Sequence, residues 1–213
     1  MSIAEKLQTI AENEQKVYHA GELSLAAFLG DTKTKIRLPD GITHLKQYVC
    51  GGTWTIRELI IPSTVYDLAN GVFSNGFELQ KVTFEGGKIT RFGAQMFSYN
   101  PKLKTVIFGC EVPEIVSNTF TGCDVLEEVT FAQPTLYGKM YFHFPSTLKK
   151  SCAYEIMRKL NNYIGTSEEL TYTFKLHANV WANVEDTTAE DYETPPSGET
   201  WKDYVTNYKG YLV

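Results

Sequence analysis

The sequence is poor in cysteine, and its cysteines show no pairing pattern. Only four occur in 213 residues, with no C-x-x-C pair and no histidine at zinc-ligand spacing beside them. We therefore expect no metal site and four free thiols, mostly buried, at Cys50, Cys110, Cys123 and Cys152. Long apolar runs are absent too. No stretch approaches the 18 consecutive apolar residues of a transmembrane helix, so membrane insertion is not expected.

The sequence also lacks a secretory leader and a cluster of basic residues. Its opening has no basic segment followed by an apolar one, which predicts folding in a cytoplasm. The formal net charge is −5, and residues 165–213 carry nine carboxylates against three lysines. A nucleic-acid groove needs clustered lysine and arginine, so we expect no nucleic-acid partner.

Motifs of known catalytic machinery are missing as well. The sequence contains no GxSxG, HExxH, GxxxxGKS or GxGxxG segment and no calcium-loop pattern. One Cys/His pair is conceivable, because His143 precedes Cys152 by nine residues. The alternative is an aromatic-rich cap with a buried thiol, and we favour it. The sequence therefore predicts a protein that is not an enzyme and uses no cofactor.

What the sequence does contain is an internal repeat of 22 to 24 residues. An aliphatic residue before each strand-like triplet recurs at Ile56, Leu79, Leu103, Leu126 and Leu148. Three further apolar columns keep the same register. They are Phe73, Phe97, Phe120 and Phe142; Ile42, Val65, Ile89 and Val112; and Leu45, Leu68, Phe92 and Ile115.

Each repeat predicts one short strand followed by a turn. Apolar pairs alternate with other residues at a period of two, as in half-buried strands. These pairs are Ile36/Leu38, Leu59/Ile61, Val82/Phe84, Val106/Phe108 and Val129/Phe131. Prolines and glycines then interrupt the chain. A unit of this length cannot bury its apolar side alone, so the units must stack into a solenoid with one continuous core.

The pattern VTF…I…F…F…L, with small residues after the phenylalanine, resembles the BspA-type leucine-rich repeat. The resemblance covers about five units between Lys33 and Lys150 and implies an α/β repeat solenoid with a sheet on its concave side. It places Gly76, Asn100 and Cys123 at equivalent positions. There Asn100 would bond turn backbone groups from a buried position, and Cys123 would act as a small hydrophobe. Gly138 departs from the pattern, which puts the stacking near it in doubt.

The first 32 residues predict a helix for attachment or oligomerisation. Ser2 and Glu5 form a capping box, and an apolar stripe follows at Ile3, Leu7, Ile10 and Val17. The helix either lies on its own solenoid or forms a short coiled coil between copies. The opening AEKLQTIAENEQKVY also resembles the start of tail and other virion proteins from phages and prophages of Gram-positive gut bacteria.

Residues 151–213 predict an α+β unit that caps the solenoid. Helical spacing runs from Ala153 to Ile164, with Gly165 as the end of that helix, and LTYTFKL alternates as a strand. Residues 185–199 are expected to form an exposed acidic loop. Trp201, Tyr204, Val205 and Tyr208 then share one helical face, and the closing GYLV resembles the end of phage-type repeat proteins.

Two surfaces are candidates for binding. The outward neighbours of the core pairs should align across the sheet as Arg37, Ile60, Thr83, Ile107 and Thr130, with a second row at Lys35, Glu58, Lys81, Thr105 and Glu128. The alternative interpretation of this face is a solvated sheet. The second surface is the aromatic C-terminal end. Its members are Tyr137, Tyr141, Tyr192, Trp201, Tyr204, Tyr208 and Tyr211.

Two functions remain open after these observations. The first is a phage or prophage virion protein, a tail accessory or receptor-binding protein, whose partners are other virion proteins or a second copy of itself. The second is a BspA-like adhesion protein at the bacterial cell surface. In both, the repeats present a surface to a protein or glycan.

Overall fold

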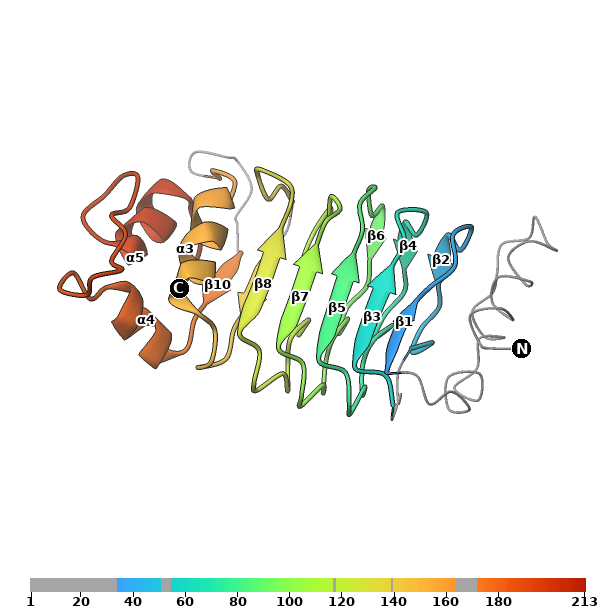
Figure 1. Ribbon diagram of the computed structural model, residues 1–213. Helices are drawn as coiled ribbons and strands as arrows, with labels where there is room; N and C mark the ends of the chain where they lie inside the picture. Colours follow the sequence, from blue (N-terminus) through green and yellow to red (C-terminus); the bar gives the residue numbers. More distant parts are fainter. Residues whose placement is uncertain (1–33, 51–54, 117, 139, 164–171) are drawn as a thin grey trace.

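The computed structural model describes residues 34–50, 55–116, 118–138, 140–163 and 172–213 (Figure 1). The predicted N-terminal helix, with Ile3, Leu7, Ile10 and Val17, lies outside these residues. Its proposed roles in attachment and oligomerisation stay predictions.

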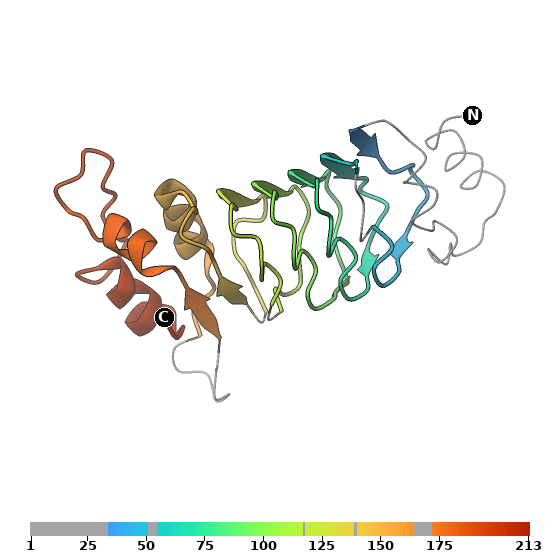
Figure 2. The ribbon, with the colours of Figure 1, turned by 90° about the horizontal axis from the view of Figure 1, so that it is seen from below.

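The described part is a solenoid built on a five-stranded parallel sheet in the order β1-β3-β5-β7-β8 (Figure 1). Four successive pairings join the five strands, so the chain completes about four turns. The strands are β1 (Lys35–Arg37), β3 (Glu58–Ile61), β5 (Lys81–Phe84), β7 (Thr105–Phe108) and β8 (Glu128–Phe131). Their row curves gently, and this sheet lies on the inner side of the curve (Figure 2).

A smaller parallel sheet forms the opposite side of the coils. It joins β2 (His44–Leu45), β4 (Asp67–Leu68) and β6 (Arg91–Phe92), and it pairs Leu45 with Leu68 and Leu68 with Phe92. These residues form one of the predicted apolar columns, and Ile115 continues it through a bridge to Met140. The core therefore fills the space between two parallel sheets.

Alternation of burial explains why each triplet forms a strand. In β3, β5, β7 and β8 the second and fourth residues are buried, and the first and third are half-buried. The period of two therefore directs one apolar pair inward and leaves two residues on the outer face. Since the register is fixed at every pairing, each inward residue lies beside its counterpart in the next coil.

Two ladders of phenylalanine rings run along the core. Phe97 stacks on Phe73 at a centroid distance of 5.4 Å and on Phe120 at 5.6 Å. Phe108 stacks on Phe84 at 5.2 Å and on Phe131 at 4.8 Å. The sequence prediction was wrong at the end of the first ladder. The ring that stacks on Phe120 belongs to Phe144, whereas Phe142 contacts Phe131 edge to face.

Asn100 satisfies backbone groups of two turns from a fully buried position. Its Oδ1 accepts from the Gly76 N–H at 2.7 Å, and its Nδ2 donates to the carbonyl oxygens of Phe73 at 2.9 Å and Phe97 at 2.5 Å. Cys123 is buried, as the resemblance implied, and its Sγ also donates to the Phe97 carbonyl oxygen at 3.0 Å. These residues fasten one coil to the next where no strand runs.

Two columns of residues in the left-handed backbone region recur once per coil. One comprises Tyr48, Gly71, Gln95 and Asn118, and the other comprises Asn75, Tyr99 and Gly122, with φ between 56° and 73°. The side chains differ widely within each column. Glycine and asparagine favour this geometry, but at Tyr48, Gln95 and Tyr99 it is imposed by stacking of the backbone.

The last coil is irregular where Gly138 departs from the repeat pattern. A Cβ on Gly138 would lie 2.0 Å from the Pro113 carbonyl oxygen, so only glycine fits this approach. Leu136 and Met140 on either side are fully buried. Stacking thus continues past Gly138, because a close backbone contact replaces the expected aliphatic side chain.

The C-terminal part begins with α3 (Lys150–Lys159), which stands beside β8 where a sixth strand would lie (Figure 1). The helix ends at Lys159, earlier than predicted, because Leu160 turns away and forms a bridge with Leu136. Gly165 lies outside the described residues. The remaining elements are β9 (Tyr141–His143), β10 (Thr173–Lys175), α4 (Ala178–Val184), α5 (Trp201–Asp203) and the π-helix η1 (Tyr204–Tyr208).

Most residues of the acidic loop 185–199 are exposed, as predicted, and the loop is also fastened to α3. Lys150 pairs with Asp191, Arg158 pairs with Glu193, and the Trp201 indole N–H donates to the Glu193 carbonyl oxygen at 2.5 Å. Two of its acidic side chains, Asp191 and Glu193, thus have basic partners on the neighbouring helix.

Candidate functional site

The face of the five-stranded sheet that points away from the core is called the sheet face below. It carries the two predicted rows in register. Strand pairing aligns Arg37 with Ile60, Thr83, Ile107 and Thr130, and it aligns Lys35 with Glu58, Lys81, Thr105 and Glu128. The structure therefore brings together all seven sheet residues proposed for binding: Arg37, Ile60, Thr83, Ile107, Thr130, Lys81 and Glu128. Their binding role stays a prediction.

The middle of the sheet face is a stripe of β-branched side chains. Ile60, Thr83, Ile107 and Thr130 are half-buried, and they follow one another across four strands. Threonine and isoleucine have few rotamers in a strand, so little side-chain entropy is lost when a partner covers them. The stripe is a pre-ordered contact area of mixed polarity.

Arg37 is engaged at one end of the stripe. Its guanidinium donates to Glu85 from Nε at 2.9 Å and to Asp40 from Nη2 at 2.8 Å, so it spans from β1 to the residue after β5. These hydrogen bonds raise the pKa of Arg37 and hold the pKa of Asp40 below its usual value. A ligand carboxylate would have to compete with two carboxylates already in place.

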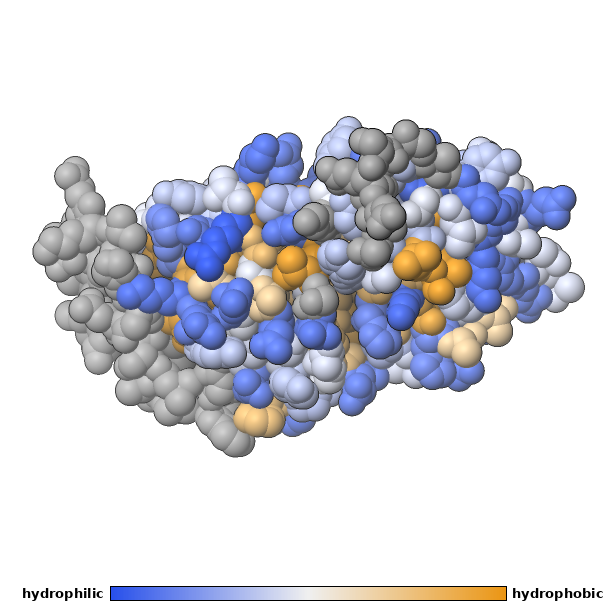
Figure 3. Space-filling model, turned by 180° about the vertical axis from the view of Figure 1, so that it is seen from behind, coloured by the Kyte–Doolittle hydropathy of each residue, from blue (hydrophilic) through white to orange (hydrophobic). Residues whose placement is uncertain are grey.

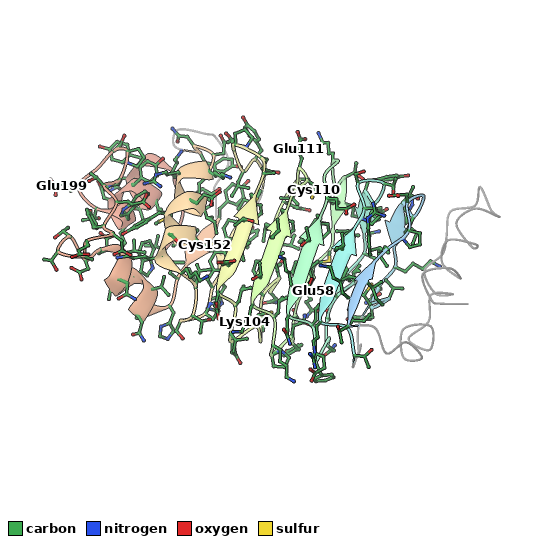
Figure 4. The ribbon with its side chains drawn as sticks, viewed as in Figure 1. Glu58, Lys104, Cys110, Glu111, Cys152 and Glu199 are labelled. Atoms are coloured by element: carbon green, nitrogen blue, oxygen red, sulfur yellow. The ribbon has the colours of Figure 1, made fainter. Side chains whose placement is uncertain are left out.

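Among the described residues, charges along the second row are paired in the same way, except at Lys81. Lys35 contacts Glu58 at 2.9 Å, and Lys149 contacts Glu128 at 2.5 Å. The bond from Lys35 lowers the pKa of Glu58, and the bond to Glu128 raises the pKa of Lys149. Lys104 and Glu127 form a further pair at 3.1 Å below the start of β7 (Figure 4).

Sequence reasoning missed most partners in these ion pairs. Glu85, Asp40, Lys149 and Lys104 lie outside the alternating triplets, in the turns before and after the strands. The repeat spacing places residues of adjacent strands side by side, but it carries no signal for a contact such as Arg37 to Glu85, which skips a strand.

The aromatic C-terminal end divides into core and surface residues. Trp201, Tyr204 and Tyr211 are buried, and Tyr141 and Tyr192 are partly buried. Tyr208, which the sequence placed on the same helical face as Trp201, is 45% exposed. Tyr137 is 62% exposed and lies on the irregular coil instead of the C-terminal unit.

The conceivable Cys/His pair does not have the chemistry of a nucleophile and its base. Burial raises the pKa of the Cys152 thiol to about 11, and the thiol bonds the backbone of Val129. His143 is exposed at the end of β9. In the described part of the chain, no group of three or more acidic, histidine or cysteine side chains is arranged to hold a metal ion.

Two of the cavities in the described residues lie away from the sheet face. One of about 600 Å³ is bordered by His143, Lys175, Trp181 and Lys202 in the C-terminal unit. The other, of about 300 Å³, lies between the fourth coil and the irregular coil. The face behind the sheet is largely hydrophilic, with small separate apolar groups (Figure 3). Within the described residues, no helix has the length and apolar character needed to cross a membrane.

Comparisons with known proteins agree with the repeat. The family model for the BspA type leucine rich repeat region (6 copies) matches residues 22–149, which is more than half of the chain. No curated protein matches. A leucine rich cell surface protein from Faecalibacterium prausnitzii A2-165 is similar at 19% identity and a TM-score of 0.39, over 63% of this chain. The match covers 33% of that protein, so this chain spans about a third of its length. The chain belongs to the BspA-type leucine-rich-repeat family.

Proposed function

We propose that the chain is a non-enzymatic binding module whose sheet face contacts a protein or glycan. The observation that carries this proposal is the β-branched stripe, Ile60 to Thr130, which is half-buried, in register and flanked by charges that, apart from Lys81, already have partners among the described residues. Such a face requires little desolvation of unpaired charge when it is covered.

The broad shape of the sheet face suits a macromolecule better than a small substrate. Side chains of five strands contribute to one open surface, whereas enzymes enclose reactants in a concave pocket. The expectation that the chain is not an enzyme becomes part of this proposal.

Two settings fit the binding role. Membership in the BspA-type family supports adhesion or interaction at a bacterial cell surface. The opening IAENEQKVY supports assembly into a phage or prophage virion, with other virion proteins or a second copy as partners. The adhesion setting rests on residues 22–149, and the virion setting rests on the short opening alone.

The test of the sheet face uses two lysine substitutions in its stripe. The full chain is titrated against intact Gram-positive gut bacteria, their purified wall glycans and extracellular-matrix proteins. Ile107→Lys and Thr83→Lys should weaken any saturable binding by about tenfold or more, since each introduces an unpaired charge into the contact. Thr90→Lys, on an exposed residue beside the opposite sheet, should leave it unchanged.

Equal binding by all three variants would rule out the sheet face as the contact surface. Release of sugar or peptide products during the titration would contradict the non-enzymatic assignment. The setting is decided by mass spectrometry of purified particles and of the cell-surface fraction from the source bacterium. The chain in neither fraction contradicts both settings.

A further inference from the structure

The second cavity, called the Tyr137 cleft below, lies at the edge of the solenoid beyond the C-terminal ends of the strands. Its volume is about 300 Å³, and Lys88, Glu111, Pro113, Gln133, Pro134 and Tyr137 border it. Glu111 marks its position on that edge, away from the sheet face (Figure 4). Neither predicted binding surface includes this cleft as a unit.

The Gln133 side chain takes the place of a backbone group at the wall of the cleft. Its Oε1 accepts from the Val112 N–H at 2.7 Å, and its Nε2 donates to the Thr135 carbonyl oxygen at 3.2 Å. In the preceding coil a backbone group takes this place, because the Ile89 N–H donates to the Glu111 carbonyl oxygen at 2.8 Å. For Val112 the Gln133 side chain supplies the acceptor instead, and Pro134 beside it has no N–H with which to extend the backbone ladder. The cleft lies where side chain replaces backbone in this way.

Tyr137 offers an aromatic surface at the cleft. At 62% it has the largest exposed fraction among the large hydrophobic side chains of the described residues. Pro113 and Pro134 provide rigid apolar walls beside it. Tyrosine and proline lose little conformational entropy when covered, so this corner is prepared for an apolar ring face.

The polar rim of the cleft is electrically neutral. Lys88 Nζ and Glu111 Oε2 lie 3.6 Å apart, and both side chains are well exposed. Their backbones are fixed by a parallel bridge, in which the Ile89 N–H donates to the Glu111 carbonyl oxygen at 2.8 Å. The rim thus presents one donor and one acceptor at a defined separation, without a net charge that would select an ionic ligand.

We propose that the Tyr137 cleft binds one neutral hexose unit of a glycan. A hexose has a C–H face that packs on an aromatic ring and hydroxyl groups that both accept and donate hydrogen bonds. Tyr137 and the prolines meet the first requirement, and Lys88 and Glu111 meet the second. The volume lies at the lower end of small-molecule pockets, which suits a single sugar ring.

The test follows chemical shifts of the full chain during titration with methyl glycosides of galactose, glucose and N-acetylglucosamine. At least one should bind with a dissociation constant on the order of 1 mM and perturb the signals of Lys88, Glu111 and Tyr137. Tyr137→Ala and Glu111→Ala should each weaken binding about tenfold or more. Tyr208→Ala, which removes another exposed tyrosine, should have no effect.

Further arms separate this proposal from its alternatives. Ile107→Lys on the sheet face should not alter hexose binding, so loss of one site is distinguishable from loss of the other. Thermal unfolding of each variant checks that it is folded. No shift with any glycoside, shifts that persist in folded Tyr137→Ala, stronger binding of galacturonate than of galactose, or displacement of hexose by an apolar peptide such as N-acetyl-leucine amide would each overturn the proposal.

Discussion

The thiol of Cys152 pairs with the backbone of Val129 as a neighbouring strand would. Its Sγ donates to the Val129 carbonyl oxygen at 2.9 Å and accepts from the Val129 N–H at 3.2 Å. Nearby, the Lys149 N–H donates to the Glu127 carbonyl oxygen at 3.0 Å, and Lys159 Nζ donates to Phe131. Figure 4 shows Cys152 on the side of α3 that faces β8. The helix therefore covers and satisfies the last strand of the sheet.

Replacement of Cys152 tests this contact. Cys152→Ala should lower the free energy of unfolding by about 1–3 kcal/mol, because the Val129 N–H and carbonyl lose their partner in a buried place. Cys152→Ser should lose less, since a hydroxyl can still donate and accept. Cys50 is the matched control, because it is buried and burial alone sets its pKa shift. At Cys50, the serine substitution should lower the free energy of unfolding more than the alanine substitution does. Urea unfolding measures all four variants, and the same order of serine and alanine at both sites would contradict this account.

Alkaline pH should destabilise the protein through its buried thiols. Burial raises the pKa of Cys50, Cys110 and Cys123 to about 12 from an ordinary value of 9.0. The folded chain thus holds these protons more tightly than the unfolded chain. The stability is fully present below pH 9 and is lost as the pH rises from 9 toward 12, by about 1.4 kcal/mol per pH unit for each thiol. Urea midpoints at pH about 8 and about 10.5 measure the change. Cys50→Ala should show a smaller decrease than the unsubstituted chain, and a constant midpoint would refute the prediction.

We expect the Asn100 side chain to contribute more to the free energy of unfolding than a single hydrogen bond would. Asn100→Leu leaves the Gly76 N–H and the carbonyls of Phe73 and Phe97 without their partner. The free energy of unfolding should fall by about 3 kcal/mol or more. Asn70 makes a comparable bond between coils, in which its Oδ1 accepts from the Ala94 N–H at 3.0 Å, but it is exposed. Asn70→Leu should cost less than about 1 kcal/mol, because water replaces the lost bond. Thermal and urea unfolding compare the two, and similar losses would contradict the role of burial.

Tyr211 predicts a stabilising substitution. Its hydroxyl is buried without a hydrogen-bond partner among the described residues, and burial raises its pKa. Tyr211→Phe should therefore raise the free energy of unfolding by about 1 kcal/mol. Tyr154 is the opposite case, since its hydroxyl donates to the Val184 carbonyl oxygen at 2.9 Å. Tyr154→Phe should lower stability by a similar amount. Calorimetric melting temperatures that move in the same direction for both variants would show the assignment to be wrong.

The repeat could be predicted from the sequence because burial requires apolar side chains at every second position of each strand. One buried aliphatic residue marks each strand, and the common spacing of these residues predicts the register of the sheet face. They are Leu59, Val82, Val106 and Val129. Features held by backbone geometry gave no such signal. The left-handed columns contain tyrosine and glutamine beside asparagine and glycine, so the residue type marks only some of their positions.

The predicted phenylalanine column was wrong where two residues fitted the repeat spacing equally well. Phe142 and Phe144 lie 22 and 24 residues after Phe120, and both spacings occur in the repeat. Both rings are buried, so the choice depends on how β9 meets the C-terminal unit. The Tyr137 cleft was also hidden, because no motif marks the residues that border it or the bond of Gln133 across coils.

The contact of α3 with β8 determines where further repeat units could be added to the solenoid. A duplicated unit inserted between β5 and β7 would find the same backbone on both of its sides and would lengthen the array without disturbing its end. A unit appended after β8 would first have to displace Cys152. Relatives of different length should therefore differ in the number of their interior coils and share the helix equivalent to α3.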